Sequence, residues 1–105
     1  MGESHDFEIR TDREGIMWLS GELDMANVES FLERTEGNLD GQPTAVLDLS
    51  GLKFVDSTGI RAFLRLARTR SEGIVLRDPR PNVRSVLAVT GIDERMGVRI
   101  QGSSG

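Results

Sequence analysis

A run of six residues near the middle of the chain limits the folds that are open to it. Residues 44–49 read TAVLDL, a short and nearly continuous apolar run that contains β-branched side chains. Such a run is typical of a strand that is buried on both faces in the centre of a sheet. We therefore predict that residues 44–49 form a central strand, flanked by other strands and covered by helices.

Strands and helices alternate on either side of this run. The predicted strands are residues 7–10, 16–20, 44–49, 74–76 and 98–100, and the predicted helices run from about Met25 or Ala26 to 39, from 58 to 70, and from Pro81 to 90. Residues 11–15 form the turn of a hairpin, and Gly21 ends its second strand. Residues 40–43 and 50–56 are connections. This β-β-α-β-α-β-α-β order predicts an α/β fold with a mixed, mostly parallel sheet, an N-terminal hairpin and about three helices packed against it.

Apolar residues at helical spacing mark the side of each predicted helix that faces the sheet. They are Val28, Phe31, Leu32, Thr35 and Leu39 in the first helix, Ile60, Phe63, Leu64 and Ala67 in the second, and Val83, Val86 and Leu87 in the third. Arg61, Arg65 and Arg68 form a basic stripe on the opposite side of the second helix. One of Met17 and Trp18 faces the core, because successive side chains of a strand point to opposite faces.

The composition excludes several classes of protein. A length of 105 residues favours a single domain, residues 1–105, with its core at about 7–100 and a flexible tail at 101–105. The chain has no cysteine, so it has neither a disulfide framework nor a thiol nucleophile. Its net charge of −4, from 17 acidic and 13 basic residues, differs from the basic excess of nucleic-acid-binding proteins.

The sequence also carries no pattern that indicates a membrane protein or an enzyme. It has no secretory signal and no apolar run of membrane-spanning length, so we expect a cytoplasmic protein that binds neither nucleic acid nor a membrane. We find no Ser-His-Asp set, no metal-ligand cluster and no glycine-rich phosphate loop. We therefore expect no catalytic residue, no metal site and no cofactor.

The most informative segment is residues 46–66, VLDLSGLKFVDSTGIRAFLRL. It combines the buried strand, a loop that ends in Asp-Ser-Thr-Gly, and an amphipathic helix. Ser57 lies at or next to the N-cap, where its hydroxyl can accept a hydrogen bond from the first helical turn, and Asp56 caps the helix if Ser57 does not. The free amides and the dipole of this helix start also favour an anion. From spacing alone, Ser57 is an ordinary capping serine, and Asp24 caps the first helix in the same way.

Three short motifs change this interpretation when they are taken together. They are GELD at residues 21–24, VLDLS at residues 46–50 and FVDSTGI at residues 54–60. Their order and spacing resemble the STAS family of anti-sigma factor antagonists, and the resemblance covers about residues 9–100. In that family, the serine after the aspartate is phosphorylated by an anti-sigma factor that is itself a protein kinase. The matching serine in this chain is Ser57.

The resemblance implies a phosphorylation site, a contact surface and a pair of partners. Ser57 is the implied phosphorylation site, and the loop that holds Asp24 is implied to lie beside it at the same end of the sheet. The residues implied to contact a partner are Asp24, Asp56, Ser57, Thr58, Gly59 and Arg61. The implied partners are an anti-sigma factor serine kinase and a phosphatase that acts on Ser57. The protein itself is expected to be a monomer without enzymatic activity.

Other roles share parts of this pattern. A STAS subunit of a lipid-transport ATPase complex and a scaffold of a stress-signalling assembly have the same fold, and a serine at position 57 in a free-standing chain favours the antagonist over both. Asp48 invites comparison with the phospho-accepting aspartate of a receiver domain. That domain also needs an early acidic pair and a late lysine, whereas the only lysine in this chain is Lys53.

Overall fold

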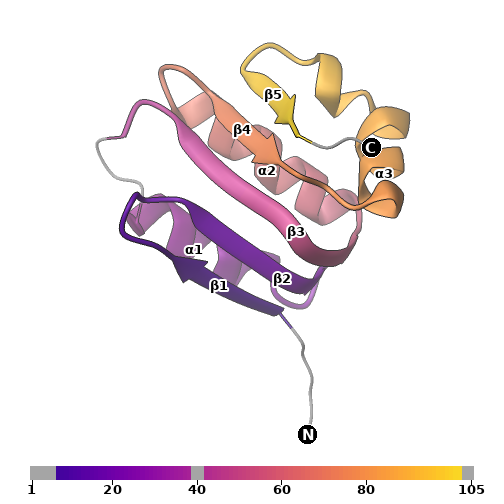
Figure 1. Ribbon diagram of the computed structural model, residues 1–105, viewed down its shortest axis with the longest axis horizontal. Helices are drawn as coiled ribbons and strands as arrows, with labels where there is room; N and C mark the ends of the chain where they lie inside the picture. The colour runs from indigo at the N-terminus through magenta and orange to yellow at the C-terminus, as the bar shows by residue number, and fades with distance from the viewer. Residues whose placement is uncertain (1–6, 39–41, 103–105) are drawn as a thin grey trace, which may run out of the picture.

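Five strands lie side by side in one sheet in the same order as in the chain (Figure 1). They are β1 (Phe7–Thr11), β2 (Met17–Leu23), β3 (Ala45–Val55), β4 (Ile74–Arg77) and β5 (Val98–Gln101). The computed structural model describes residues 7–38 and 42–102. β1 and β2 are antiparallel, and the pairs β2–β3, β3–β4 and β4–β5 are parallel. The predicted mixed sheet with an N-terminal hairpin is therefore confirmed.

Each parallel pair of strands is connected through a helix. α1 (Val28–Asn38) joins β2 to β3, α2 (Ser57–Thr69) joins β3 to β4, and α3 (Pro81–Thr90) with the short 3₁₀ helix η1 (Ile92–Glu94) joins β4 to β5. α1 and α2 lie next to each other behind the sheet in Figure 1, and α3 lies beside the second half of β3. α3 ends before Gly91, whose φ of 77° is a left-handed conformation that glycine adopts without a steric penalty. Both ends of α3 match the sequence prediction.

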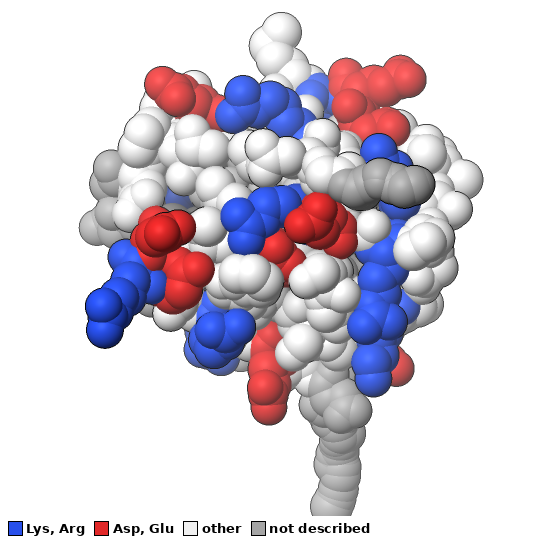
Figure 2. Space-filling view, in the orientation of Figure 1, with Lys and Arg blue, Asp and Glu red and all other residues white. Residues whose placement is uncertain are grey.

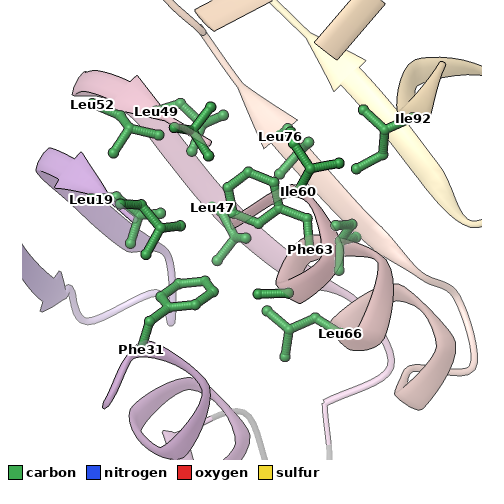
Figure 3. Close-up of a cluster of buried hydrophobic side chains, with 14 of the residues drawn as sticks. Leu19, Phe31, Leu47, Leu49, Leu52, Ile60, Phe63, Leu66, Leu76 and Ile92 are labelled. Atoms are coloured by element: carbon green, nitrogen blue, oxygen red, sulfur yellow. The ribbon is translucent and has the colours of Figure 1, made fainter. Parts of the chain in front are cut away.

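The hydrophobic core lies between the sheet and the helices α1 and α2 and includes Val83 and Leu87 of α3 and Ile92 of η1 (Figure 3). Phe31 of α1 and Phe63 of α2 meet edge to face, with their ring centres 5.9 Å apart. Both rings and Leu47 of β3 are fully buried. Thr35 is buried as well, and its hydroxyl donates a hydrogen bond within its own helix at 3.2 Å. The predicted apolar faces of α1 and α2 are confirmed, apart from Leu39, which lies outside the described residues.

β2 continues past the glycine at which the sequence predicted its end. Gly21 has a φ of 92° and pairs with Phe7 of β1 and with Leu52 of β3. The register between β2 and β3 shifts next to this glycine. A glycine with positive φ is a common feature of β-bulges. Gly21 therefore bends the strand without ending it, and the predicted boundary is wrong.

β3 has eleven residues in place of the six predicted, because residues 50–55 extend the strand instead of forming a connection. Leu52 and Val55 in this extension are buried and pair with β2. Gly51 allows β2 and β3 to approach each other closely, since a Cβ there would lie 3.0 Å from the carbonyl oxygen of Leu19. The predicted connection at residues 50–56 is therefore wrong for all but its last residue.

α1 begins at Val28, two or three residues after the predicted start at Met25 or Ala26. The residues before it form a turn that leads into the helix. The carbonyl oxygen of Asp24 accepts hydrogen bonds from the N–H groups of Asn27 at 3.1 Å and Val28 at 3.0 Å. The first turn predicted for this helix is thus present, but it is not regular α-helix.

β5 includes Gln101, although the sequence predicts a flexible tail from this residue on. Gln101 pairs with Arg77 of β4, so the sheet extends one residue into the predicted tail. Residues 103–105 of that tail and residues 40–41 of the predicted connection lie outside the described residues.

Met17 and Trp18 point to opposite faces of the sheet, as predicted. Met17 is fully buried in the core, whereas Trp18 is partly exposed. The indole N–H of Trp18 donates to the carboxylate of Asp12 at 2.9 Å. The guanidinium carbons of Arg10 and Arg77 lie 5.4 and 5.1 Å from the centre of the indole ring, which is typical of cation–π contacts. These contacts fix the only tryptophan on a polar face of the sheet.

Asp48 is a buried carboxylate with structural partners on both of its oxygens. One oxygen accepts hydrogen bonds from the N–H and the hydroxyl of Ser50 at 2.9 and 2.6 Å, and the other lies 2.8 Å from Nε of Arg77. Burial raises the pKa of Asp48, but the bonds from Ser50 and then from Arg77 outweigh it and hold the pKa below its usual value. Both oxygens of Asp48 are therefore engaged by partners within the fold.

Candidate functional site

The carboxyl ends of β2 and β3 bring two loops together at one end of the sheet. The two strands are parallel, and their last residues, Leu23 and Val55, are paired. The N–H of Asp56 donates a hydrogen bond to the carbonyl oxygen of Leu23 at 3.2 Å. Asp24 and Asp56, which follow these strands, therefore start neighbouring loops. The predicted placement of Asp24 at the same end of the sheet as Ser57 is confirmed.

Asp24 uses its polar groups within its own turn. Its carboxylate accepts a hydrogen bond from the N–H of Ala26 at 3.0 Å, and its own N–H donates to the side-chain oxygen of Asn27 at 3.0 Å. The side-chain amide of Asn27 also donates to the carbonyl oxygen of Glu22 at 2.9 Å. The bond from the N–H of Asp24 to Asn27 corresponds to one half of a capping box, whereas the carboxylate of Asp24 bonds one residue earlier than in that motif. Asp24 therefore stabilises the turn that precedes α1, whereas the helix that it was predicted to cap begins only at Val28. Its contact with a partner stays a prediction.

Asp56, and not Ser57, is the N-cap of α2. Its Oδ1 accepts hydrogen bonds from the N–H groups of Thr58 at 2.9 Å and Gly59 at 3.3 Å, and from the hydroxyl of Thr58 at 2.5 Å. Burial raises the pKa of Asp56, but these bonds and one from the backbone of Met25 outweigh it and lower the pKa below its usual value. Of the two caps that the sequence left open, the structure selects Asp56.

Ser57 is the first residue of α2, and it is exposed. Its hydroxyl makes no hydrogen bond with any residue that the structure describes. Thr58 is partly buried instead, and its hydroxyl is engaged by Asp56. Of these two neighbouring hydroxyl groups, that of Ser57 is the one that a second protein can reach without breaking an internal hydrogen bond.

Gly59 allows α2 to start close to the strands. A Cβ at this position would lie 2.5 Å from Cγ2 of Val55 and 3.1 Å from Cδ2 of Leu23. Gly59 is buried, so it lies beneath the loop rather than on its outer surface. The role that the structure shows for Gly59 is close packing, and its contact with a partner stays a prediction.

The three arginines of the predicted basic stripe are exposed on α2. Arg65 pairs with Glu36 of α1 at 3.0 Å. Arg61 forms no ion pair with the residues described. It lies one helical turn after Ser57, and residues four apart in a helix are neighbours on its surface. Among the described residues, Arg61 is therefore an unpaired cation next to the serine hydroxyl, whereas Arg65 already has a partner.

Two exposed apolar side chains close to these loops were not singled out from the sequence. Met25 is 74% exposed in the turn after β2, and Phe54 is 46% exposed two residues before Asp56. The sequence placed Met25 at the start of the first predicted helix and Phe54 in the predicted connection at residues 50–56. The signal that could have found them was the presence of large apolar residues in segments that were expected to be polar.

The face of the sheet opposite α1 and α2 carries both signs of charge. Figure 2 shows basic and acidic side chains interspersed on this face. Within residues 7–38 and 42–102, no group of three or more His, Cys, Asp or Glu side chains is arranged to hold a metal ion. The helices in the same part of the chain are all too short or too polar to cross a membrane.

A comparison with protein families identifies the group to which this fold and sequence belong. Residues 8–100 match the family described as "Mlab, STAS domain". The chain belongs to the STAS domain family. No curated protein matches the sequence of this STAS domain.

Several solved structures share the fold at low sequence identity. An anti-sigma factor antagonist from Mycobacterium paratuberculosis has a TM-score of 0.72 at 22% identity, over 90% of this chain and 84% of that one. An anti-sigma-factor antagonist (STAS) domain protein from Planctomyces limnophilus has a TM-score of 0.69 at 23% identity, over 94% and 92%. The anti-sigma factor antagonist SpoIIAA in its unphosphorylated form has a TM-score of 0.63 at 21% identity, over 94% and 90%. At these identities, the likeness shows that the fold is shared.

Proposed function

We propose that this STAS domain is an anti-sigma factor antagonist that works by partner switching. Its unphosphorylated form binds an anti-sigma factor that is also a serine kinase, and this binding frees a sigma factor. Phosphorylation of Ser57 by the kinase causes the complex to dissociate, and a phosphatase restores the unphosphorylated form. The family, and the names of the solved structures with the same fold, support this proposal.

The observation that carries the proposal is the exposed hydroxyl of Ser57 at the start of α2, which has no hydrogen-bond partner among the described residues. A kinase must place the γ-phosphate in line with the attacking hydroxyl, so the acceptor side chain has to protrude from its own protein. Ser57 meets this condition, whereas the hydroxyl of Thr58 would first have to leave Asp56.

A phosphate on Ser57 changes the surface more than the fold. It adds about −1.5 to −2 charges. Repulsion from Asp56 at about 6 Å, for an effective dielectric constant between about 20 and 80, is of order 1–5 kcal/mol. The N-terminus of α2 offsets up to about 2 kcal/mol of this repulsion. With this offset, the net cost is at most about 3 kcal/mol, which is less than the roughly 5–15 kcal/mol by which folded domains are stable, so we expect the phosphorylated domain to keep its fold.

The same charge has a larger effect at an interface. Burying a phosphate against a partner without matching donors costs several kcal/mol. A loss of about 4 kcal/mol corresponds to roughly a thousandfold in affinity. The phosphate therefore acts on binding and leaves the domain itself folded.

In this scheme, the protein is the substrate and the ligand of the kinase rather than an enzyme. ATP and magnesium are bound by the kinase, and the antagonist acts as a cytoplasmic monomer without a cofactor. The contact surface includes Ser57 and Arg61, which are exposed, with Asp24, Asp56 and Thr58 beside them. Gly59 supports this surface from beneath.

Incubation of the purified protein with candidate anti-sigma kinases and ATP, followed by mapping of the phosphate by mass spectrometry, tests the proposal. We expect one phosphate on Ser57, none on a Ser57→Ala variant, and undiminished labelling of Thr58→Val. Labelling of Thr58, or of Ser57→Ala, contradicts the assignment. The alternative roles, a lipid-transport ATPase subunit or a signalling scaffold, predict stable recovery in a larger assembly that Ser57→Asp does not disturb.

A further inference from the structure

The end of β3 that leads to Ser57 has a strand on only one of its two sides. β4 pairs with β3 from Ala45 to Asp48, and the pairing stops there. Residues 50–55 continue along β2 alone, with a shifted register. The backbone carbonyl groups on the other side have no strand partner within the described residues, so side chains or water must supply their hydrogen bonds.

Side chains from the segment between β4 and α3 and from the first turn of α3 occupy this open side. Nε of Arg80 donates to the carbonyl oxygen of Ser50 at 2.9 Å, and the side-chain amide of Asn82 donates to the carbonyl oxygen of Lys53 at 2.8 Å. At the start of the same edge, the carboxylate of Asp48 accepts hydrogen bonds from the N–H and the hydroxyl of Ser50. Side-chain donors thus bond to β3 where a neighbouring strand is missing.

The segment that supplies these donors has little conformational freedom. Asp78 has a φ of 55°, the only positive φ of a non-glycine residue in the described chain, and its N–H donates to the carbonyl oxygen of Gln101 at 2.7 Å. Pro79 is buried and Pro81 is the first residue of α3. Each proline fixes its own φ near −65°. Arg80 lies between these two prolines and is the N-cap of α3.

We propose that Arg80 and Asn82 are positioning residues for Ser57. Their side chains replace the missing strand and hold residues 50–55 against β2, so that α2 begins at a fixed place. The first turn of α3 is thereby coupled to the serine at the start of α2. The local stabilisation of β3 is independent of the proposed function, whereas its effect on phosphorylation rests on it.

Hydrogen exchange of the full chain, followed by mass spectrometry, measures this stabilisation. Asn82→Asp keeps the shape of the side chain but removes the donor, and an acidic residue in the first turn of a helix favours α3. Arg80→Ala removes the other donor. We expect amides in residues 50–57 to exchange roughly two- to tenfold faster in each variant, as for the loss of one hydrogen bond, with unchanged exchange in β1 and α1.

Arg84→Ala is the matched control. Arg84 is exposed on α3, and its side chain has no hydrogen bond with the residues described. Its substitution should leave the exchange of residues 50–57 unchanged, and Arg80→Lys, which keeps a donor, should restore protection. Unchanged exchange in both Asn82→Asp and Arg80→Ala overturns the proposal. Uniformly faster exchange over the whole domain overturns it as well, because that result reports a loss of global stability, which urea unfolding checks.

Phosphorylation kinetics give a second readout. With a kinase that labels Ser57, we expect Arg80→Ala and Asn82→Asp to lower kcat/KM by a similar two- to tenfold factor, and Arg84→Ala to leave it unchanged. Equal rates for all variants overturn the positioning role in phosphorylation. If no kinase labels the wild-type chain, the proposed function fails, and the exchange measurement alone decides whether Arg80 and Asn82 position this segment.

Discussion

Replacing Gly59 by alanine tests how closely α2 must approach the sheet to present Ser57. The added Cβ would lie 2.5 Å from Cγ2 of Val55 and 3.1 Å from the side chain of Leu23. Val55 is 2% exposed and Leu23 is fully buried, so neither side chain has free space to move into. Overpacking of this kind costs about 1–3 kcal/mol, whereas the helix propensity of alanine offsets at most about 1 kcal/mol. We therefore expect the free energy of unfolding to fall by about 1–2 kcal/mol and Tm by roughly 4–15 °C.

Urea unfolding and calorimetry of two glycine variants check this expectation. Gly37 of α1 is exposed, and a Cβ added there would meet no atom within 4 Å, so Gly37→Ala should leave stability unchanged or raise it by up to about 1 kcal/mol. The replacement of glycine by alanine should thus lower the free energy of unfolding at position 59 and leave it unchanged or raise it at position 37. In a Val55→Ala background, which removes the clashing methyl group, Gly59→Ala should cost less. Wild-type stability of Gly59→Ala, or an equal cost in both backgrounds, would refute the packing argument.

Three further predictions concern the surface at this end of the sheet. Asp56→Ala should lower the free energy of unfolding by about 0.5–2 kcal/mol at pH 7. Because the folded pKa of Asp56 is lowered, its charged form stabilises the fold above the unfolded pKa of about 3.9, and this contribution is lost as the pH falls through the folded value. Urea unfolding should therefore show the gap to wild type narrowing below about pH 4, and a constant gap would contradict this. Ser57→Asp should weaken binding to the cognate kinase in calorimetry, whereas Ser57→Ala should retain it. Both variants should stay within about 0.5 kcal/mol of wild-type stability, because Ser57 is not the cap. Undiminished binding of the true phosphoprotein would show that partner switching is wrong. Arg61→Ala should weaken that binding more than Arg65→Ala, since Arg65 is already paired with Glu36, and equal losses would count against a special role for Arg61.

The order of strands and helices could be predicted because it follows from local patterns. Residues 44–49 have the length and apolar character of a buried strand, and the first half of β3 is where they predict it. Ile60, Phe63 and Ala67 recur at helical spacing, and all of them are buried on one side of α2. A pattern of this kind is complete within one segment, so no knowledge of the rest of the fold is needed.

The second half of β3 could not be predicted, because what stabilises it is distant in the sequence. Ser50, Gly51 and Lys53 are typical of loops, and no local pattern marks them as a strand. The structure holds them through hydrogen bonds from Arg80 and Asn82 and through the bulged pairing with β2. Tertiary contacts therefore override local propensity at the segment that leads to Ser57.

The cap of α2 was left open by the sequence for a different reason. Asp56 and Ser57 are both favourable N-cap residues, and adjacent positions cannot be distinguished by spacing. Thr58 decides between them in the structure, because its hydroxyl adds a further hydrogen bond to the carboxylate of Asp56. The same contact separates the two hydroxyl groups by exposure, which the sequence alone could not do.

In residues 56–59, helix capping, close packing and the exposed hydroxyl group belong to different side chains. Asp56 caps α2 with the help of Thr58, and Gly59 lets the helix pack against the strands. None of these contacts involves the hydroxyl of Ser57, so its phosphorylation breaks no capping bond and no packing contact among them. Modification of the capping residue itself would remove about 0.5–2 kcal/mol from the stability of the fold each time. Because the cap and the exposed hydroxyl belong to adjacent residues, the phosphorylation that we propose for Ser57 would act mainly on the affinity for a covering partner, and the domain would stay folded through repeated cycles of modification.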